Sequence, residues 1–139
     1  MLRRIGTSYA LTLVVFLAID AVWLVTTYDR LYRPAIGHLL RDGFALAPAL
    51  AFYALYIVGV VVFAVMPGQT SGRVAVAAAR GALFGLVAYA TYDLTNQATL
   101  RDWPWHVTLI DLCWGTLASA AAAAAACRLT LGARTRRRV

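Results

Sequence analysis

The sequence predicts an all-α integral membrane four-helix bundle, and three observations support this fold class. The 139-residue chain is 62% hydrophobic and only 14% charged, whereas soluble domains carry about 25% charged residues. Four apolar runs are long enough to cross a bilayer as helices, which takes about 20 residues each. The Arg residues gather on one side of these runs, as is typical of cytoplasmic loops. The length predicts a single domain.

The limits of the four predicted spans follow from the apolar runs and from proline and glycine signals. The first run is longer than the apolar part of a signal peptide and no cleavage site follows it, so we expect it to be retained. The second has Pro48 in its first turn and is predicted to end at Pro67 and Gly68. The spans cover residues 5–27, 46–66, 73–100 and 106–129, and residues 130–139 form a basic cytoplasmic tail within the single domain 1–139.

The distribution of Arg predicts the orientation. Nine Arg residues lie on the side of the two termini and four on the opposite side. Cytoplasmic loops carry the excess of positive charge, so both termini are predicted to be cytoplasmic, in a bacterial inner membrane. A net charge of +7 would suggest nucleic acid in a soluble chain. Because the Arg residues cluster near the termini of a membrane protein, we expect no nucleic acid partner.

Both outer connections contain apolar residues. Residues 28–47 are too apolar for a free loop, and large apolar side chains recur there at helical spacing. This pattern predicts a short amphipathic segment at the membrane interface between the first two helices. The segment could cover the space below it, or be an ordinary connector. In the second connection, Trp103-Pro104-Trp105 is predicted to be an aromatic anchor at the headgroup level.

Three aspartates fall within the predicted spans: Asp20, Asp93 and Asp111. A charged residue at the centre of a membrane helix costs roughly 2.5–3.5 kcal/mol, and such residues usually face the bundle interior or a wet cavity. At a rise of ~1.5 Å per residue, all three lie ~6–9 Å to the outer side of the mid-plane. Three helices therefore bring a carboxyl group to one level. The alternative is that each makes only a structural hydrogen bond to a neighbouring helix.

Aromatic and polar residues accompany these aspartates. The third helix has a polar stripe at i, i+3, i+4 and i+7, and Ile19-Asp20-x-x-Trp23 is echoed by Ile110-Asp111-x-x-Trp114. The three aspartates are the candidates for catalytic acid–base groups, and no metal site or cofactor is assigned. The predicted ligand-binding residues are Asp20, Trp23, Tyr53, Tyr56, Tyr89, Tyr92, Asp93, Asn96, Asp111 and Trp114.

The inner half of the bundle is predicted to be tightly packed. Ala77, Gly81 and Gly85 form a ridge of small residues, and Ala118 to Ala126 is almost entirely alanine. Small residues let helix backbones approach closely. With large aromatic and polar residues at the outer end, the bundle is predicted to be a wedge that opens outward.

The stretches GLVAYATYDLTNQATLRDWPWHVTLIDLCWGT and FLAIDAVWL carry a resemblance to a known family. The runs Tyr92-Asp93-Leu94-Thr95-Asn96 and Asp111-x-x-Trp114-Gly115 are its most specific parts. The chain resembles an uncharacterised bacterial family of small four-helix predicted inner-membrane proteins, domain-of-unknown-function family 2177. The resemblance covers nearly the whole chain. It implies a four-helix inner-membrane protein and no established activity.

Three functions are compatible with the sequence. The favoured one is a polar pocket, lined by carboxylates and aromatic rings in the outer half of the bilayer, that binds or helps to modify a membrane lipid or another amphipathic small molecule. The alternatives are a proton- or cation-coupled small transporter or channel acting as a homodimer, and a structural or assembly subunit. In the last case the partner is another membrane protein. No motif of a soluble enzyme occurs in the sequence. Whether the protein is an enzyme is left open.

Overall fold

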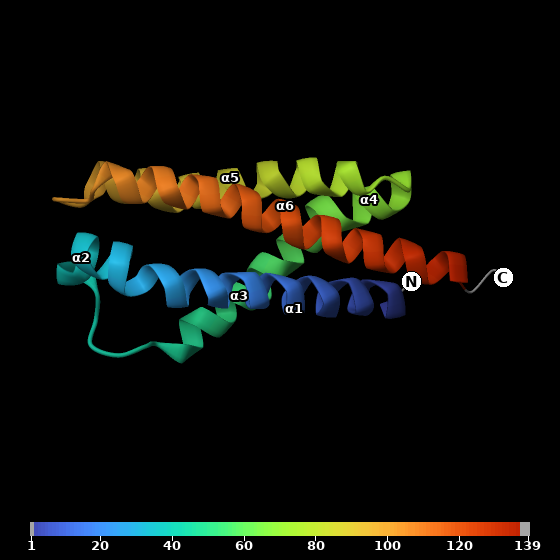
Figure 1. Ribbon diagram of the computed structural model, residues 1–139, viewed down its shortest axis with the longest axis horizontal. Helices are drawn as coiled ribbons and strands as arrows, with labels where there is room; N and C mark the ends of the chain where they lie inside the picture. The colour runs from blue at the N-terminus through green and yellow to red at the C-terminus, as the bar shows by residue number, and fades with distance from the viewer. Residues whose placement is uncertain (1, 137–139) are drawn as a thin grey trace.

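The structure is a computed structural model that describes residues 2–136 of the chain. Within these residues every regular element is a helix, which confirms the all-α prediction (Figure 1). Of the predicted tail, residues 137–139 lie outside the described part. The elements are α1 (Leu2–Thr27), η1 (Tyr28–Tyr32), α2 (Arg33–Ile36), η2 (Gly37–Leu39), α3 (Leu46–Val60), η3 (Val61–Val65), α4 (Met66–Ser71), α5 (Val74–Thr99) and α6 (Trp105–Arg136).

Four helical stretches are long and apolar enough to cross a membrane, as the sequence predicted. They are Arg3–Leu39, Leu46–Ser71, Val74–Thr99 and Trp105–Ala133. The N-terminal end of α1 and the C-terminal end of α6 lie at the same end of the molecule (Figure 1), which an even number of crossings requires. The cytoplasmic location of that end stays a prediction.

The second long helix continues past Pro67, where the sequence predicted its end. Proline lacks an N–H, and in a regular α-helix its ring collides with the carbonyl four residues back. The preceding turn, η3, is π-helical, and the N–H of Met66 donates to the carbonyl of Val61, five residues back. This wider turn gives the proline ring room. The helix ends instead at Gly72, whose φ of 68° is a left-handed conformation that glycine adopts freely.

The connection after α1 remains helical. η1 is a π-helical turn, η2 is a 3₁₀ turn, and together with α2 they carry the chain to Leu39. Ile36 is buried against Trp103, in the turn before α6, and against Val107 in the first turn of α6. The segment therefore lies against the end of the bundle that is far from the termini (Figure 1). Its location at a membrane interface stays a prediction.

α5 and α6 pack with their backbones in close contact. A Cβ atom added at Gly81 would lie 2.6 Å from the carbonyl oxygen of Ser119. One added at Gly85 would lie 2.0 Å from the carbonyl oxygen of Gly115. Ala77, the third member of the small-residue ridge, is fully buried. The prediction that small residues let these helices approach closely is confirmed.

The helices separate toward the other end. η3 and α4 pack closely against α5, whereas α3 has little contact with it. Figure 1 shows α3 running obliquely away from α5 and α6. Leu50 and Leu55 of α3 are accordingly exposed. The described part of the bundle is therefore a wedge, packed tightly near the termini and open at the end that carries the aspartates.

Candidate functional site

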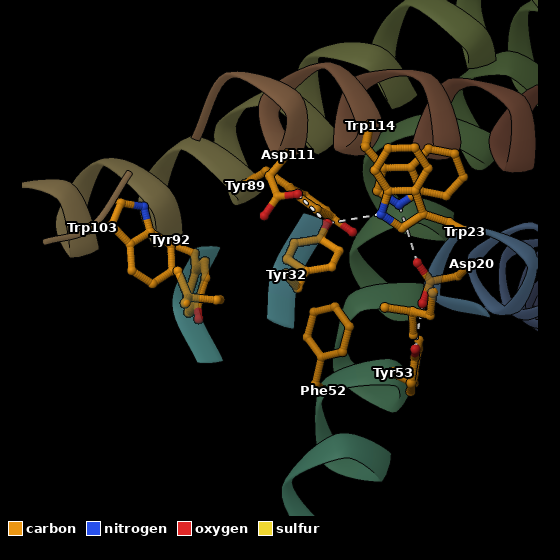
Figure 2. Close-up of a pocket in the computed structure, with 12 residues that line it drawn as sticks. Asp20, Trp23, Tyr32, Phe52, Tyr53, Tyr89, Tyr92, Trp103, Asp111 and Trp114 are labelled. Atoms are coloured by element: carbon orange, nitrogen blue, oxygen red, sulfur yellow. Dashed lines mark hydrogen bonds between the residues drawn. The ribbon is translucent and has the colours of Figure 1, made fainter. Parts of the chain in front are cut away.

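A cavity of about 260 Å³ lies at the open end of the wedge, and we call it the acidic chamber. Residues from α1, η1, α2, α3, α5, α6 and the turn before α6 surround it, so every long helix contributes to its wall. Figure 2 shows the principal side chains. The lining residues are Asp20, Trp23, Leu24, Tyr32, Ile36, Phe52, Tyr53, Tyr89, Tyr92, Trp103, Asp111 and Trp114.

Asp20 is the first acidic group of the chamber, and two other helices supply its hydrogen-bond donors. The hydroxyl of Tyr53 on α3 donates to Oδ2 at 2.5 Å, and the indole Nε1 of Trp114 on α6 donates to Oδ1 at 3.3 Å. Only 6% of Asp20 is exposed. Asp20 therefore ties α1 to α3 and α6, and its carboxyl group points into the bundle.

Asp111 is the second acidic group, and its donor comes from the connection after α1. The hydroxyl of Tyr32 on η1 donates to Asp111 Oδ1, and the indole Nε1 of Trp23 donates to that same hydroxyl oxygen at 3.0 Å. The rings of Trp23 and Trp114 stack with their centroids 4.3 Å apart and an interplanar angle of 7°. The two Asp-x-x-Trp repeats thus meet across the bundle. Trp114 donates directly to Asp20, whereas Trp23 donates to the Tyr32 hydroxyl that bonds to Asp111.

Asp93 lies behind the chamber wall, on the buried face of α5. It is fully buried, and both of its carboxyl oxygens lack a hydrogen-bond donor among the described residues. Its carboxyl group lies near enough to that of Asp111 for the two to interact electrostatically. Two ionised carboxylates in contact repel each other strongly. The pair must therefore share a proton or face a positive charge.

A larger cavity of about 570 Å³ adjoins the acidic chamber, and we call it the apolar groove. It opens between α3 and α5, on the side where α3 diverges from the bundle. The two cavities lie next to each other, because four residues line both: Phe52, Tyr89, Tyr92 and Asp111. Tyr56, Ala88 and Thr91 complete the groove.

The sequence matches a family model over a region that includes this whole site. The model describes a predicted membrane protein (DUF2177), and it covers residues 5–128. The chain belongs to this family. No curated protein and no solved structure matches it. Every residue of the acidic chamber and of the apolar groove lies within the matched region.

The structure of this DUF2177 protein brings most of the sequence-predicted site residues together. Those that line the acidic chamber are Asp20, Trp23, Tyr53, Tyr89, Tyr92, Asp111 and Trp114. Tyr56 lines the apolar groove instead and shares a 2.7 Å hydrogen bond with Ser119. Asp93 is buried and is not among the residues that line either cavity. Asn96 is half-buried on α5 and is not among the residues that line either cavity.

Three prominent lining residues were missed by the sequence analysis: Tyr32, Phe52 and Trp103. Trp103 was predicted to be an anchor at the headgroup level, and this prediction is wrong because only 6% of the residue is exposed. Its indole Nε1 donates to the hydroxyl of Thr108 at 3.0 Å, and the side chain of Gln97 holds its carbonyl at 2.9 Å. These bonds turn the ring inward. Trp105 is the residue of this pair that faces outward.

The chamber of the DUF2177 protein contains acidic groups without basic partners. No Arg or His side chain is among its lining residues. The ion pair found among the described side chains joins Arg33 and Asp29 at 3.5 Å, and both are exposed. In the described part of the chain, no group of three or more His, Cys, Asp or Glu side chains is arranged to hold a metal ion.

We expect Tyr53→Phe to destabilise the protein by roughly 1.5–3 kcal/mol, since hydrogen bonds to charged groups contribute about that much. The substitution removes the shorter of the two bonds to Asp20. Tyr9→Phe is the matched control, because the Tyr9 hydroxyl joins the same two helices through a neutral 3.2 Å bond to the Ala54 carbonyl. Unfolding of the detergent-solubilised protein measures both effects. Equal losses in the two variants would contradict the role assigned to Asp20.

Proposed function

We propose that this multi-pass membrane protein binds a membrane lipid or another amphipathic small molecule, with its polar head in the acidic chamber and its chain in the apolar groove. The observation that carries this proposal is the wall shared by the two cavities. A space of about 260 Å³ with two carboxyl groups in its wall adjoins a more apolar space of about 570 Å³. An amphipathic molecule has the same two-part character.

The exposure of the groove supports a ligand that enters from the membrane. Phe52 is 46% exposed and Tyr92 is 61% exposed, although both line the groove. In the proposed orientation these side chains face lipid. A chain that moves from lipid into an apolar groove gains little from the hydrophobic effect, because lipid tails are already apolar. The head group in the chamber must therefore supply most of the selectivity.

The carboxyl groups are also placed to transfer protons at a bound head group. Asp20 accepts hydrogen bonds from two donors, and its carboxyl group lines the chamber. Asp111 and Asp93 are near neighbours, and two carboxyl groups in such a pair can share a proton. Chemical modification of the ligand would also require a second reactant. Binding is therefore the function that the geometry supports best.

The polar residues near the termini are separated from the acidic chamber, and this separation weighs against a transport pathway. There Gln69 Nε2 donates to Ser8 Oγ and to Thr130 Oγ1, both at 2.8 Å. The buried face of α1 reads Ser8, Thr12, Phe16 and Asp20 at four-residue spacing. Phe16 is fully buried and packs against Tyr56 with ring centroids 5.1 Å apart. Phe16 thus lies between this polar cluster and Asp20 on the buried face of α1.

We expect wild-type protein, purified in mild detergent, to retain an amphipathic molecule that native mass spectrometry and lipid extraction detect. Ala88→Trp should remove it, because Ala88 lines the groove and an indole there would fill the space. Val87→Trp is the matched control, since Val87 is the adjacent residue of α5, is 56% exposed and is not a lining residue of either cavity. Equal occupancy in all three proteins, or none in wild type, would contradict the proposal.

Two further measurements separate the alternative functions. Proton or cation flux into liposomes that Asp93→Asn abolishes would favour a transporter or channel over a binding protein. Purification only as a homo-oligomer or as a complex with another membrane protein, with both cavities empty, would favour a structural or assembly subunit. We expect no flux, and we expect a ligand in the protein.

A further inference from the structure

We propose that the head group recognised in the acidic chamber carries a positively charged nitrogen, as in an alkylammonium or a trimethylammonium amphiphile. This inference rests on the proposed function and names the class of ligand for the same site. It follows from three features of the chamber: its uncompensated acidic groups, the buried carboxyl behind them, and the aromatic rings around them.

The charges of the chamber all have one sign. Asp20 and Asp111 line it, and no basic side chain accompanies them among the lining residues. Tyr and Trp donors stabilise these carboxyl groups but bring no positive charge. Removing a carboxylate from water without a counter-charge costs several kcal/mol. A cationic head group would supply that counter-charge, whereas a phosphate or sulfate head would add to the repulsion.

Asp93 is an independent sign of a missing partner. It is fully buried and neither oxygen has a donor among the residues that the structure describes, and native proteins rarely leave a buried polar group in that state. Its carboxyl group interacts with that of Asp111, which lines the chamber. A cation placed against Asp111 would be stabilised by both groups. Asp93 would then act as a positioning residue that strengthens the negative potential at the head-group site.

The rings around the chamber fit the same ligand. The stacked pair of Trp23 and Trp114 lies in the wall together with Tyr32 and Phe52, as Figure 2 shows. Aromatic faces attract cations through their quadrupoles, and boxes of such rings recognise quaternary ammonium groups. Rings that served only to exclude water would need no acidic groups between them. Carboxylates and aromatic rings together favour a cationic nitrogen over a neutral polar head.

The test compares three probes that share a dodecyl tail and differ in their head group: dodecyltrimethylammonium, dodecylammonium and dodecyl sulfate. Each is titrated into protein in a neutral sugar-based detergent, and tryptophan fluorescence reports binding near Trp23 and Trp114. We expect the two cationic probes to bind about tenfold more tightly than the sulfate, or better. Asp111→Asn and Asp20→Asn should reduce this preference severalfold, and Asp111→Glu should keep it.

Asp42→Asn is the control for overall charge, because Asp42 is exposed and lies outside the chamber; it should leave the preference unchanged. Equal or tighter binding of the sulfate, with all binding lost in Ala88→Trp, would overturn the head-group inference and leave the proposed function standing. Binding of no probe, or binding that Ala88→Trp does not alter, would overturn both. An equal loss of preference in Asp42→Asn would also overturn the inference.

Discussion

Gly85→Val is expected to destabilise the protein by about 3 kcal/mol or more. Overpacking of a well-packed interior typically costs roughly 1–3 kcal/mol, and here the neighbour cannot rotate away. A Cβ atom at this position would lie 2.0 Å from the carbonyl oxygen of Gly115 and 2.5 Å from the hydroxyl oxygen of Ser119. The first of these atoms belongs to the backbone of α6. The two helices would have to move apart, and the acidic chamber would lose its geometry.

The matched control is Gly6→Val on α1, where an added Cβ atom meets nothing within 4 Å. Thermal unfolding in detergent, followed by far-ultraviolet circular dichroism, compares the two variants with wild type. We expect a large loss of stability for Gly85→Val and little change for Gly6→Val. Similar stabilities of the two variants would show that α5 and α6 do not pack through this ridge.

Asp93→Asn is expected to stabilise the protein in the absence of ligand, by roughly 1–3 kcal/mol. The amide N–H of asparagine would donate to the Asp111 carboxyl without the shared proton that two neighbouring carboxyl groups require. A buried group without a partner would gain one, at almost unchanged volume. The same change should weaken binding of the cationic probes, because it removes a carboxyl group from behind the chamber wall.

A gain in stability together with weaker binding of the cationic probes would distinguish a functional Asp93 from a structural one. Unfolding in detergent gives the stability, and the fluorescence titration gives the binding. Asp42→Asn, an exposed position outside the chamber, should change neither. Destabilisation by Asp93→Asn would mean that the carboxyl group of Asp93 forms stabilising interactions that the amide cannot replace.

Much of the site could be predicted because charge inside an apolar helix is so costly. Asp20 and Asp111 must point inward on energetic grounds alone, and both are buried in the structure. Helical spacing then places Trp23 and Trp114 on the same faces. The depth of each aspartate follows from counting residues along a helix. These steps need no knowledge of how the helices are arranged around one another.

The remaining features depend on tertiary contacts that local patterns do not contain. The indole of Trp114 bonds to Asp20, and the rings of Trp23 and Trp114 stack, which requires α1 and α6 to face each other. Tyr32 reaches Asp111 only because η1 continues the first helix over the end of the bundle. Trp103 turns inward because Gln97 and Thr108 hold it. A Trp in a turn between two membrane helices fits an interfacial anchor equally well on sequence grounds.

The limits of the second helix show the same distinction. Proline followed by glycine is a strong local signal for a helix end, yet the chain continues through Pro67 because a π-helical turn precedes it. π-helical turns occur often at functional sites. In this protein η3 lies between α3, which diverges from α5, and α4, which packs against α5.

The most direct test of the account is an experimental structure of the protein in lipid nanodiscs. We predict density for one amphipathic molecule, with its head between Asp20 and Asp111 and its chain along the groove between Phe52 and Ala88. Water alone in the acidic chamber, or a lipid chain in the groove whose head stays outside, would contradict it. In either case the buried carboxyl groups would serve the packing of the helices and not a ligand.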